Sequence, residues 1–364
     1  MARPRVSFAA PKSSNQCDLF QEVGFVEERV YRLKGMARVF TALIIAMASI
    51  VVAYAAQAPP GRKDRPSAAW VMTRTPDGQP DLQGNWNFRS PTPLERPPEF
   101  ADKEFLSDAD VAAVERRAGR LLQADRPDGT LMNTPPWWLD FGTRVAQNRR
   151  SSLIVDPRDG RLPAMTPQGL MRQADQTRAR ATLDGPESLN PWERCITRGL
   201  PAVMLPSAYN NYLQLLQTPG FVVIVTEMIH EARIVPLGGP RHLPDGQRAW
   251  MGDSRGRWDG NTLVVDTTNF SEQADFWAPV SGGMRYMGGG GRLRLTERFT
   301  RIDADTIDYR FTVDDPATWT RPWTVAVPLT RTNDRIFEYA CHEANYNVTH
   351  MLGAARSAGA PKGR

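Results

Sequence analysis

The chain has 364 residues and a formal net charge of +5 at pH 7, from 45 basic and 40 acidic side chains. Residues 1–58 hold seven of the basic and four of the acidic side chains, so the rest carries a net charge of about +2. A charge this small excludes nucleic acid as an expected partner. The residues after position 58 are numerous enough to form one large domain with its own core.

Residues 36–58 have the pattern of a secretory signal peptide. Met36-Ala37-Arg38 is a basic start, an apolar run extends to Ala56, and Ala56-Gln57-Ala58 is a small-residue cleavage site. An uncleaved N-terminal anchor is the alternative, and the membrane is then a partner only through this leader. We therefore expect a periplasmic or secreted protein. Residues 1–35 fit no export signal and are expected to be untranslated, with Met36 as the start, or disordered.

The cysteines fit an exported chain. Cys17 lies in the leader, which leaves Cys195 and Cys341 in the mature protein. Two cysteines in an oxidising compartment predict one disulfide bond. The alternative is a pair of buried free thiols.

The mature chain is expected to contain a flexible tether at 59–80, a single β-rich domain at 81–356 and a disordered tail at 357–364. An irregular insertion of helices and loops is expected at about 90–200. One helix is predicted at 107–124, with Ser107 as its N-cap. A second is predicted from Pro167 to about Leu183, because proline favours the first turn of a helix.

From Phe221 to Glu343 the sequence alternates between strand patterns and turn residues. Ile307, Tyr309, Phe311 and Val313 share one face of a predicted strand, as do alternate residues from Trp323 to Leu329. This pattern predicts an antiparallel meander that closes into a barrel or folds into a two-sheet sandwich. Glycines 288–291, beside several aromatic residues, suggest a mobile flap over a pocket mouth or a plain flexible insertion.

Two resemblances to known families follow from short motifs. Gly84-Asn85-Trp86 opens the first predicted strand and resembles the opening motif of lipocalin-like barrels, in which the tryptophan plugs the closed end and an apolar ligand enters at the open end. Glu193 to Pro201, Trp250 to Trp258 and Tyr339 to Glu343 resemble blocks of a family of exported bacterial proteins. That resemblance implies export and a shared fold, and it carries no catalytic residues.

Candidate proton carriers lie at two places. Glu227, His230 and Glu231 come at the end of an apolar strand, and His342 and Glu343 follow Cys341 directly. Histidine suits proton transfer near neutral pH, and neighbouring carboxylates tune it. The structural alternatives are a core histidine bound to a backbone carbonyl and an ordinary disulfide neighbourhood.

Candidate ligand-binding residues are more scattered. Arg255 and Arg257 lie on one face of a predicted strand after Asp253, so they could clamp an anion or form an ion-pair lattice. Glu297 is in register with core residues, which requires a partner or a raised pKa. The remaining candidates are Tyr209, Asn210, Asn211 and Trp323.

Motifs for nucleophilic hydrolases, zinc proteases, nucleotide-binding loops and dinucleotide folds are absent, and the histidine spacing suits no metal, so neither a metal nor a cofactor is expected. We expect a lipocalin-like barrel that binds a small apolar or aromatic molecule. As an enzyme it would be a metal-independent lyase, isomerase or hydratase. The alternatives are a polysaccharide-binding or polysaccharide-processing sandwich and a structural envelope protein. The sequence assigns no oligomeric state.

Overall fold

The computed structural model describes residues 70–123, 139–239, 241–280, 283–343 and 345–359. The predicted signal peptide, residues 1–35 and most of the predicted tether lie outside these residues. The described residues belong to one compact unit, which is mainly β with three α-helices. Within this part of the chain, no helix is both long and apolar enough to cross a membrane.

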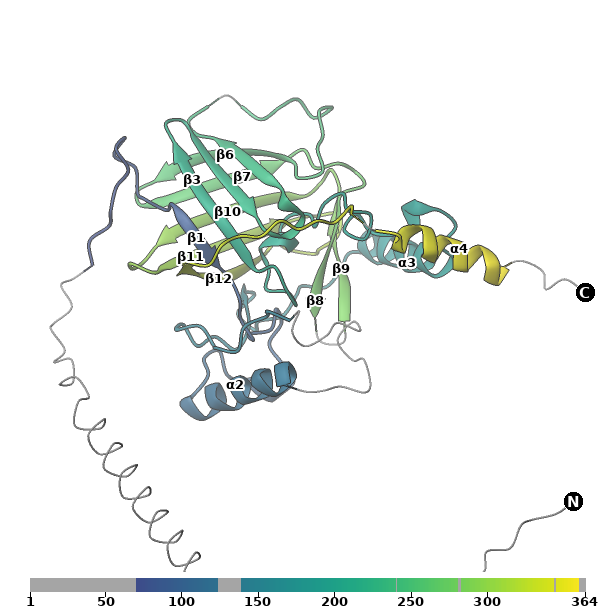
Figure 1. The fold of residues 1–364 in the computed structure, drawn as a ribbon, viewed down its shortest axis with the longest axis horizontal. Coiled ribbons are helices and arrows are strands. Elements are labelled where there is room, and N and C mark those ends of the chain that lie inside the picture. Colours follow the sequence, from purple (N-terminus) through teal and green to yellow (C-terminus); the bar gives the residue numbers. More distant parts are fainter. Residues whose placement is uncertain (1–69, 124–138, 240, 281–282, 344, 360–364) are drawn as a thin grey trace, which may run out of the picture. The chain divides into compact units, whose positions relative to one another are not determined.

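Ten strands form the principal sheet, and all their pairings are antiparallel (Figure 1). Along the sheet the strands are β5 (Ala232–Pro236), β4 (Phe221–Thr226), β3 (Tyr212–Thr218), β1 (Gly84–Asn87), β12 (Trp323–Thr332), β11 (Thr306–Asp314), β10 (Arg294–Arg301), β7 (Thr262–Thr268) and β6 (Asp253–Asp259), with β2 (Ile154–Asp156) also paired to β12. A separate hairpin consists of β8 (Asp275–Val280) and β9 (Gly283–Gly289). The prediction of a mainly β, antiparallel fold is therefore confirmed.

The inner face of the sheet is the apolar face that the sequence alternation predicted. Tyr309 lies opposite Phe299 on one side and Val327 on the other, and all three are fully buried. The Phe299 and Tyr309 ring centroids are 4.6 Å apart. Trp86 is also fully buried, and its indole Nε1 donates to the carbonyl of Leu82 at 3.0 Å. Burial of alternate side chains thus fixes the register of the strands.

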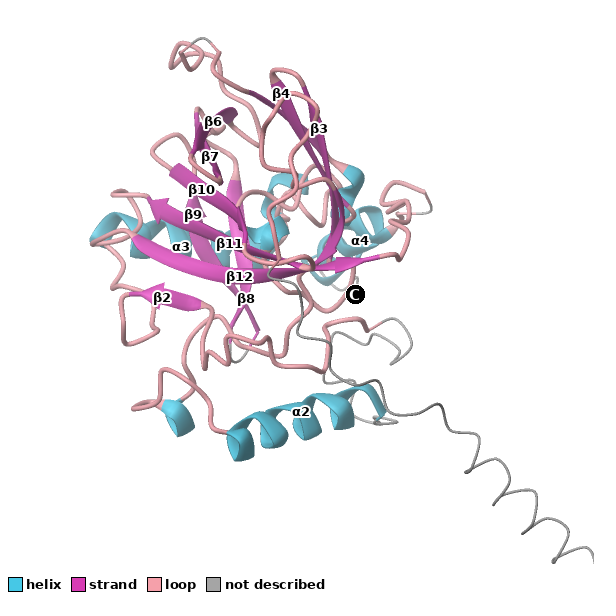
Figure 2. Cartoon of the chain, turned by 90° about the vertical axis from the view of Figure 1, so that its left-hand side faces the viewer, coloured by secondary structure: helices cyan, strands magenta, loops and turns pink. Residues whose placement is uncertain are grey.

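The sheet curves so that its two ends turn toward each other, with β3 and β4 opposite β6 and β7 in Figure 2. Among the described residues no strand ladder joins β5 to β6, so the sheet is not a closed barrel. The two ends are joined at an isolated parallel bridge between Leu237 and Gly256. A Cβ atom at position 256 would lie 2.6 Å from Leu237 Cδ2, so the glycine permits this approach.

The three α-helices lie outside the sheet. They are α2 (Asp108–Gln123), α3 (Pro167–Thr182) and α4 (Asn347–Gly359). Ser107 and Asp110 cap α2 reciprocally, each accepting the other's backbone N–H. Thr166 Oγ1 accepts the N–H of Gly169 at the start of α3. The sequence predicted α2 and α3 but not α4.

The described residues between β1 and β3 contain little regular structure, as expected. Besides α2, β2 and α3 it contains the short 3₁₀ turns η1 (Pro98–Phe100), η3 (Pro186–Ser188) and η4 (Ala202–Met204). A further 3₁₀ turn, η5 (Met228–His230), follows β4. The structure differs from the sequence prediction at both ends of the domain. Residues 70–80 are tied down, with Arg74 and Pro80 bridged, and α4 includes residues 357–359 of the predicted tail.

Candidate functional site

A cleft of about 1190 Å³ lies beneath the segment that joins β12 to α4. We call residues 333–343 and 345–346 the strap; in Figure 1 they form the yellow segment leading to α4. The cleft is lined by residues of the strap, by the segment 192–195, by the start of β3 and by the end of β4. We call it the strap cleft. Its lining combines aromatic rings with amides and carboxylates.

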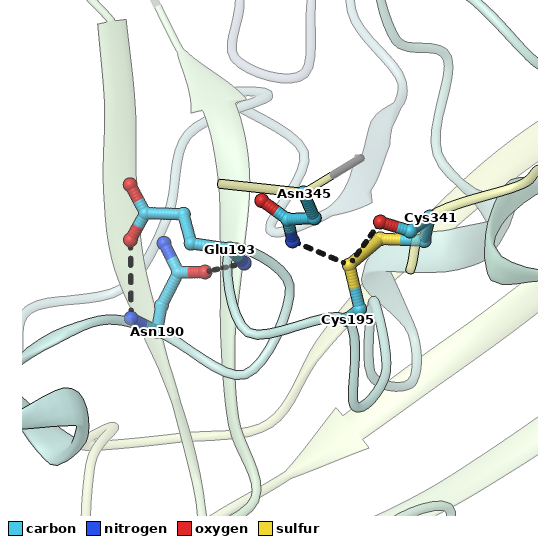
Figure 3. Close-up of a disulfide and its surroundings, with 5 residues drawn as sticks. All are labelled: Asn190, Glu193, Cys195, Cys341 and Asn345. Atoms are coloured by element: carbon cyan, nitrogen blue, oxygen red, sulfur yellow. Dashed lines mark hydrogen bonds between the residues drawn. A yellow bond between two sulfur atoms is a disulfide. The ribbon is translucent and has the colours of Figure 1, made fainter. Parts of the chain in front are cut away.

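A disulfide bond attaches the strap to the rest of the domain. Cys195 and Cys341 are bonded, with their Cα atoms 5.7 Å apart, as the sequence predicted (Figure 3). Asn345 Nδ2 donates to the sulfur of Cys195 at 3.0 Å. The same sulfur lies 2.9 Å from the carbonyl oxygen of Cys341, and this is a contact without a proton because a disulfide sulfur carries none. The cystine therefore forms one wall of the cleft.

Glu227 is the buried carboxyl group of the cleft. It follows β4 directly, is 3% exposed, and its N–H donates to the carbonyl of Tyr212. Oε1 accepts the N–H of Phe337 in the strap at 3.1 Å, and Oε2 is buried without a partner of normal geometry among the described residues. Burial raises the pKa of Glu227, against the opposing effects of Phe337 and Asn210. The protonated form of this carboxyl is therefore favoured.

Two phenols, those of Tyr209 and Tyr212, line the cleft. Burial raises the pKa of Tyr209 to about 12, and the neighbouring Tyr339 phenol adds to the shift. Burial, with the charge of Asp140, also raises the pKa of Tyr212 to about 12. Tyr212 donates to Asp334 at 3.3 Å. Both phenols are therefore neutral hydrogen-bonding groups at neutral pH.

The cleft contains several of the residues that the sequence singled out. Tyr209, Asn210, Glu227 and Glu343 line it, together with both cysteines. Glu343 is exposed on the strap, whereas Glu227 is buried. The disulfide and the strap bring these groups together from distant parts of the chain.

Other predicted site residues lie elsewhere. His342 is exposed and does not line the cleft. Asn211 is fully buried, and its amide donates to the carbonyls of Asp140 and Ser207, so it holds backbone in place. Glu231 accepts the hydroxyl of Thr197 at 3.0 Å. The backbone of His230 ends η5, and its side chain lies outside the described residues.

The sequence left two interpretations for Arg255 and Arg257 on β6, an anion clamp or an ion-pair lattice, and the structure shows ion pairs. Arg255 pairs with Asp253 at 2.6 Å, and Arg257 pairs with Asp266 on β7. Asp253 also lies 3.0 Å from Nδ1 of His242. Each arginine therefore has a carboxylate of its own, and none of the three predicted residues lines the strap cleft.

Two further predicted ligand-binding residues are buried inside the sheet. Trp323 is fully buried, with its ring 5.9 Å from that of Trp319. Glu297 is also fully buried, where both of its oxygens accept from Arg233 and Oε1 accepts from Tyr309 at 2.9 Å. The sequence correctly required a partner for Glu297, but that partner makes the group structural.

The cleft also contains residues that sequence reasoning did not assign to it, among them Asp140, Trp192 and Tyr339. Trp192 directly precedes one of the three sequence blocks described above, and Tyr339 begins another. The position of Trp192 and Tyr339 at these blocks was the sequence signal that could have identified them as site residues. Asp140 carried no signal of its own.

Comparison with known proteins adds no relative: no family model, no curated protein and no solved structure matches this chain. Among the described residues, no group of three or more His, Cys, Asp and Glu side chains is arranged to hold a metal ion.

Proposed function

We propose that this chain is an exported protein whose strap cleft binds a small ring-bearing molecule, on which Glu227 acts as a metal-independent acid/base. The reaction class is that of a lyase, isomerase or hydratase. One observation carries the proposal: a buried carboxyl with a raised pKa has one oxygen fixed by the strap and the other buried beside Asn210 without a hydrogen bond of normal geometry among the described residues. Buried titratable groups in clefts are typical of catalytic sites.

The geometry of Glu227 suits proton transfer. The Phe337 N–H fixes Oε1 and so orients the carboxyl group. Oε2 is then the oxygen available to give or take a proton. Because the pKa of Glu227 is raised, the group stays protonated to a higher pH and becomes a stronger base once ionised.

The walls of the cleft suit a ligand with a flat face. Trp192, Tyr209 and Tyr339 provide rings, and Asn210 and Asn345 provide amides that both donate and accept hydrogen bonds. Phe337 is 70% exposed on the strap, where a ligand at the mouth of the cleft can cover it. This combination favours an aromatic molecule with polar substituents.

A carbohydrate is the second candidate ligand. The cleft is open to solvent, and Trp192 lines it together with amides and carboxylates. Aromatic faces stack on sugar rings, while amides and carboxylates bind hydroxyl groups. A saccharide-binding or saccharide-processing protein is therefore the alternative, and a purely structural envelope protein would leave the buried carboxyl of Glu227 without a role.

For the fold, we propose a lipocalin-like barrel that is incompletely closed. The approach of β5 and β6 at Gly256 supports this, as does the buried Trp86. The interior is filled by aromatic side chains such as Phe299, Phe311 and Trp323. The ligand site is accordingly the strap cleft rather than the centre of the barrel. The cystine and the predicted leader support export.

The test begins with mass spectrometry of small molecules that co-purify with the wild-type protein, followed by turnover assays of the molecule found. Glu227→Gln is expected to lower turnover by about 10²–10⁴-fold while binding is retained. Glu99→Gln, an exposed acid outside the cleft, is the control. Unchanged turnover in Glu227→Gln, or a molecule bound away from the strap, would overturn the proposed mechanism.

A further inference from the structure

The lining of the strap cleft carries an excess of acidic side chains. Among the described residues its one basic side chain is that of Arg335, and its acids are Asp140, Glu193, Glu227, Asp334, Glu338 and Glu343. Arginines outside the lining neutralise two of these acids, because Arg89 donates to Asp140 and Arg180 donates to Glu193. The remaining negative charge is therefore concentrated on the strap and at Glu227.

The acids of the strap are available to a ligand. Asp334, Glu338 and Glu343 are exposed, and Asp334 accepts the hydroxyl of Tyr212. Within the part of the chain that the structure describes, Glu338 and Glu343 form neither an ion pair nor a side-chain hydrogen bond. Arg335 balances one of the three charges, so the strap side of the cleft has a net negative charge.

Glu227 provides a second, independent indication of a ligand. It is 3% exposed and lines the cleft, and its Oε2 is buried beside Asn210 without a hydrogen bond of normal geometry among the described residues. Buried polar atoms are normally hydrogen-bonded. An ionised carboxylate only accepts hydrogen bonds, so a ligand that completes this group supplies donors.

The aromatic rings of the cleft also favour a cation, and the arginines nearby indicate where it would lie. The guanidinium carbon of Arg198, a buried residue outside the lining, is 4.0 Å from the ring centroid of Trp192. Phe337, on the strap, is 70% exposed and has no such cation over its ring among the described residues. Because Arg198 repels a second cation from the Trp192 wall, the favourable position for a ligand cation is the strap side.

We propose that the strap cleft recognises a small ring-bearing amine, bound as its ammonium ion, with the ammonium group at Glu338 and Glu343 and the ring against Trp192 and Tyr209. An ammonium group has only donors, which match the carboxylates of the strap. The neutral ring faces the aromatic wall and reaches the carboxyl of Glu227. This inference rests on the proposed function and names its substrate class.

The test compares matched ligands on the oxidised full-length protein at neutral pH. Benzylamine and tryptamine are titrated beside benzyl alcohol and tryptophol, which have the same rings without the charge, and beside benzoate and indole-3-acetate, which carry the opposite charge. Glucosamine and glucose form a further pair, which shows whether the amine belongs to a sugar. Calorimetry and the shift in Tm measure affinity. At least one amine is expected to bind about ten-fold or more tightly than its uncharged partner.

The double variant Glu338→Gln with Glu343→Gln tests the position of the ammonium group. It is expected to remove most of the amine preference and to leave the affinity for the alcohols unchanged. Because neither side chain has a contact of its own in the described structure, Tm of the free protein should stay at the wild-type value. Glu338→Asp with Glu343→Asp keeps both charges and is expected to retain part of the preference.

The control double variant Asp102→Asn with Asp245→Asn removes the same charge from exposed positions outside the lining. It is expected to keep the amine preference, which separates a local contact from the overall charge of the protein. An amine preference that survives the change of Glu338 and Glu343 to glutamine, or is lost equally in the control, would overturn the inference.

The panel also separates this inference from the proposed function. Alcohols, glucose or carboxylates that bind as well as the amines overturn the ligand class and leave the proposed cleft intact. An amine preference together with unchanged turnover in Glu227→Gln overturns the proposed mechanism alone. Failure of every ligand to bind, with nothing co-purifying, overturns both proposals.

Discussion

Two buried arginines lie in different regions of this molecule and have opposite surroundings. Arg233, on β5, is 8% exposed, and Arg198, beside the strap cleft, is 5% exposed. Burial lowers the pKa of each guanidinium. For Arg233, Glu297 outweighs burial and raises the pKa, whereas Arg198 has no carboxylate beside it among the described residues, and its pKa falls to about 10.

The two regions differ in how completely their buried charges are paired. The inside of the sheet satisfies its charges: Arg233, Glu297 and Tyr309 form a closed network of hydrogen bonds. At the strap cleft Oε2 of Glu227 is buried without a hydrogen bond of normal geometry, and behind the cleft Arg198 has no carboxylate within ion-pair distance among the described residues. A fold that satisfies buried charge in one region and leaves it unsatisfied in another indicates where a ligand completes the structure.

The strongest test of this comparison removes the partner of the satisfied arginine. Glu297→Leu leaves Arg233 buried and unpaired and removes the acceptor of Tyr309. We expect a loss of about 3–5 kcal/mol in the free energy of unfolding, because an uncompensated buried charge is strongly destabilising. Urea denaturation at neutral pH measures this loss.

The double variant Arg233→Met with Glu297→Leu is the matched control. Replacing both charges by apolar groups of similar size is expected to restore most of the lost stability. If Glu297→Leu loses less than about 1 kcal/mol, the Arg233 pair is not the satisfied counterpart of Arg198, and the comparison fails.

A second test releases the strap. Replacing Cys195 and Cys341 by serine is expected to cost about 2–4 kcal/mol, the usual contribution of a native disulfide. The bond from Phe337 to Glu227 depends on the strap and should weaken with it. Hydrogen exchange at the Phe337 amide measures that change, and urea denaturation measures the stability.

The reduced wild-type protein is the control for the serine substitutions themselves. It should match the double variant in both stability and exchange. Unchanged protection of the Phe337 amide in either protein would show that the strap holds its position without the cystine. The cleft would then be preformed by packing alone.

Much of the fold could be predicted because its signals are local. The alternation from Ile307 to Val313 specified the buried face of β11, and Ser107 marked the start of α2. Pairing between distant strands left no such signal. β1 lies between β3 and β12, although each of these strands is more than a hundred residues away in sequence.

The glycines at 288–291 show how a local signal can mislead. Their sequence suggested a mobile flap, but Gly288, Gly289 and Gly290 are buried at the end of β9 with positive φ angles. A Cβ atom at position 289 would lie 2.1 Å from the carbonyl oxygen of Ala274. Glycine is required here for close packing and backbone conformation.

The site was predictable only in part, for a similar reason. Glu227 and the cystine were found because a carboxyl at a strand end and two cysteines are recognisable types. Trp192 lines the cleft and Arg198 lies against its ring, near the Tyr209 and Tyr339 phenols, in a neighbourhood that the long-range cystine assembles. Equally, no sequence pattern distinguishes the paired Arg255 from the unpaired Arg198.

Asp275 on β8 is a third buried charge, and it extends the comparison to a site that contains neither of these arginines. Its ion pair is long, with Arg172 Nη2 3.5 Å from Oδ1. Burial raises the pKa of Asp275 from 3.8 to about 6, and Arg172 offsets this only in part. Between about pH 4 and pH 6 the unfolded chain loses this proton before the folded protein does. Stability therefore falls as the pH rises through this window.

Asp275→Asn removes the charge and hence the penalty. We expect the variant to match wild-type stability near pH 4 and to exceed it by up to about 3 kcal/mol above pH 6, the equivalent of a two-unit shift. Urea denaturation from pH 4 to pH 8 measures the difference, with the exposed Asp245→Asn as a control that shows no such trend. A constant difference across this range would mean that Asp275 is paired in the folded state.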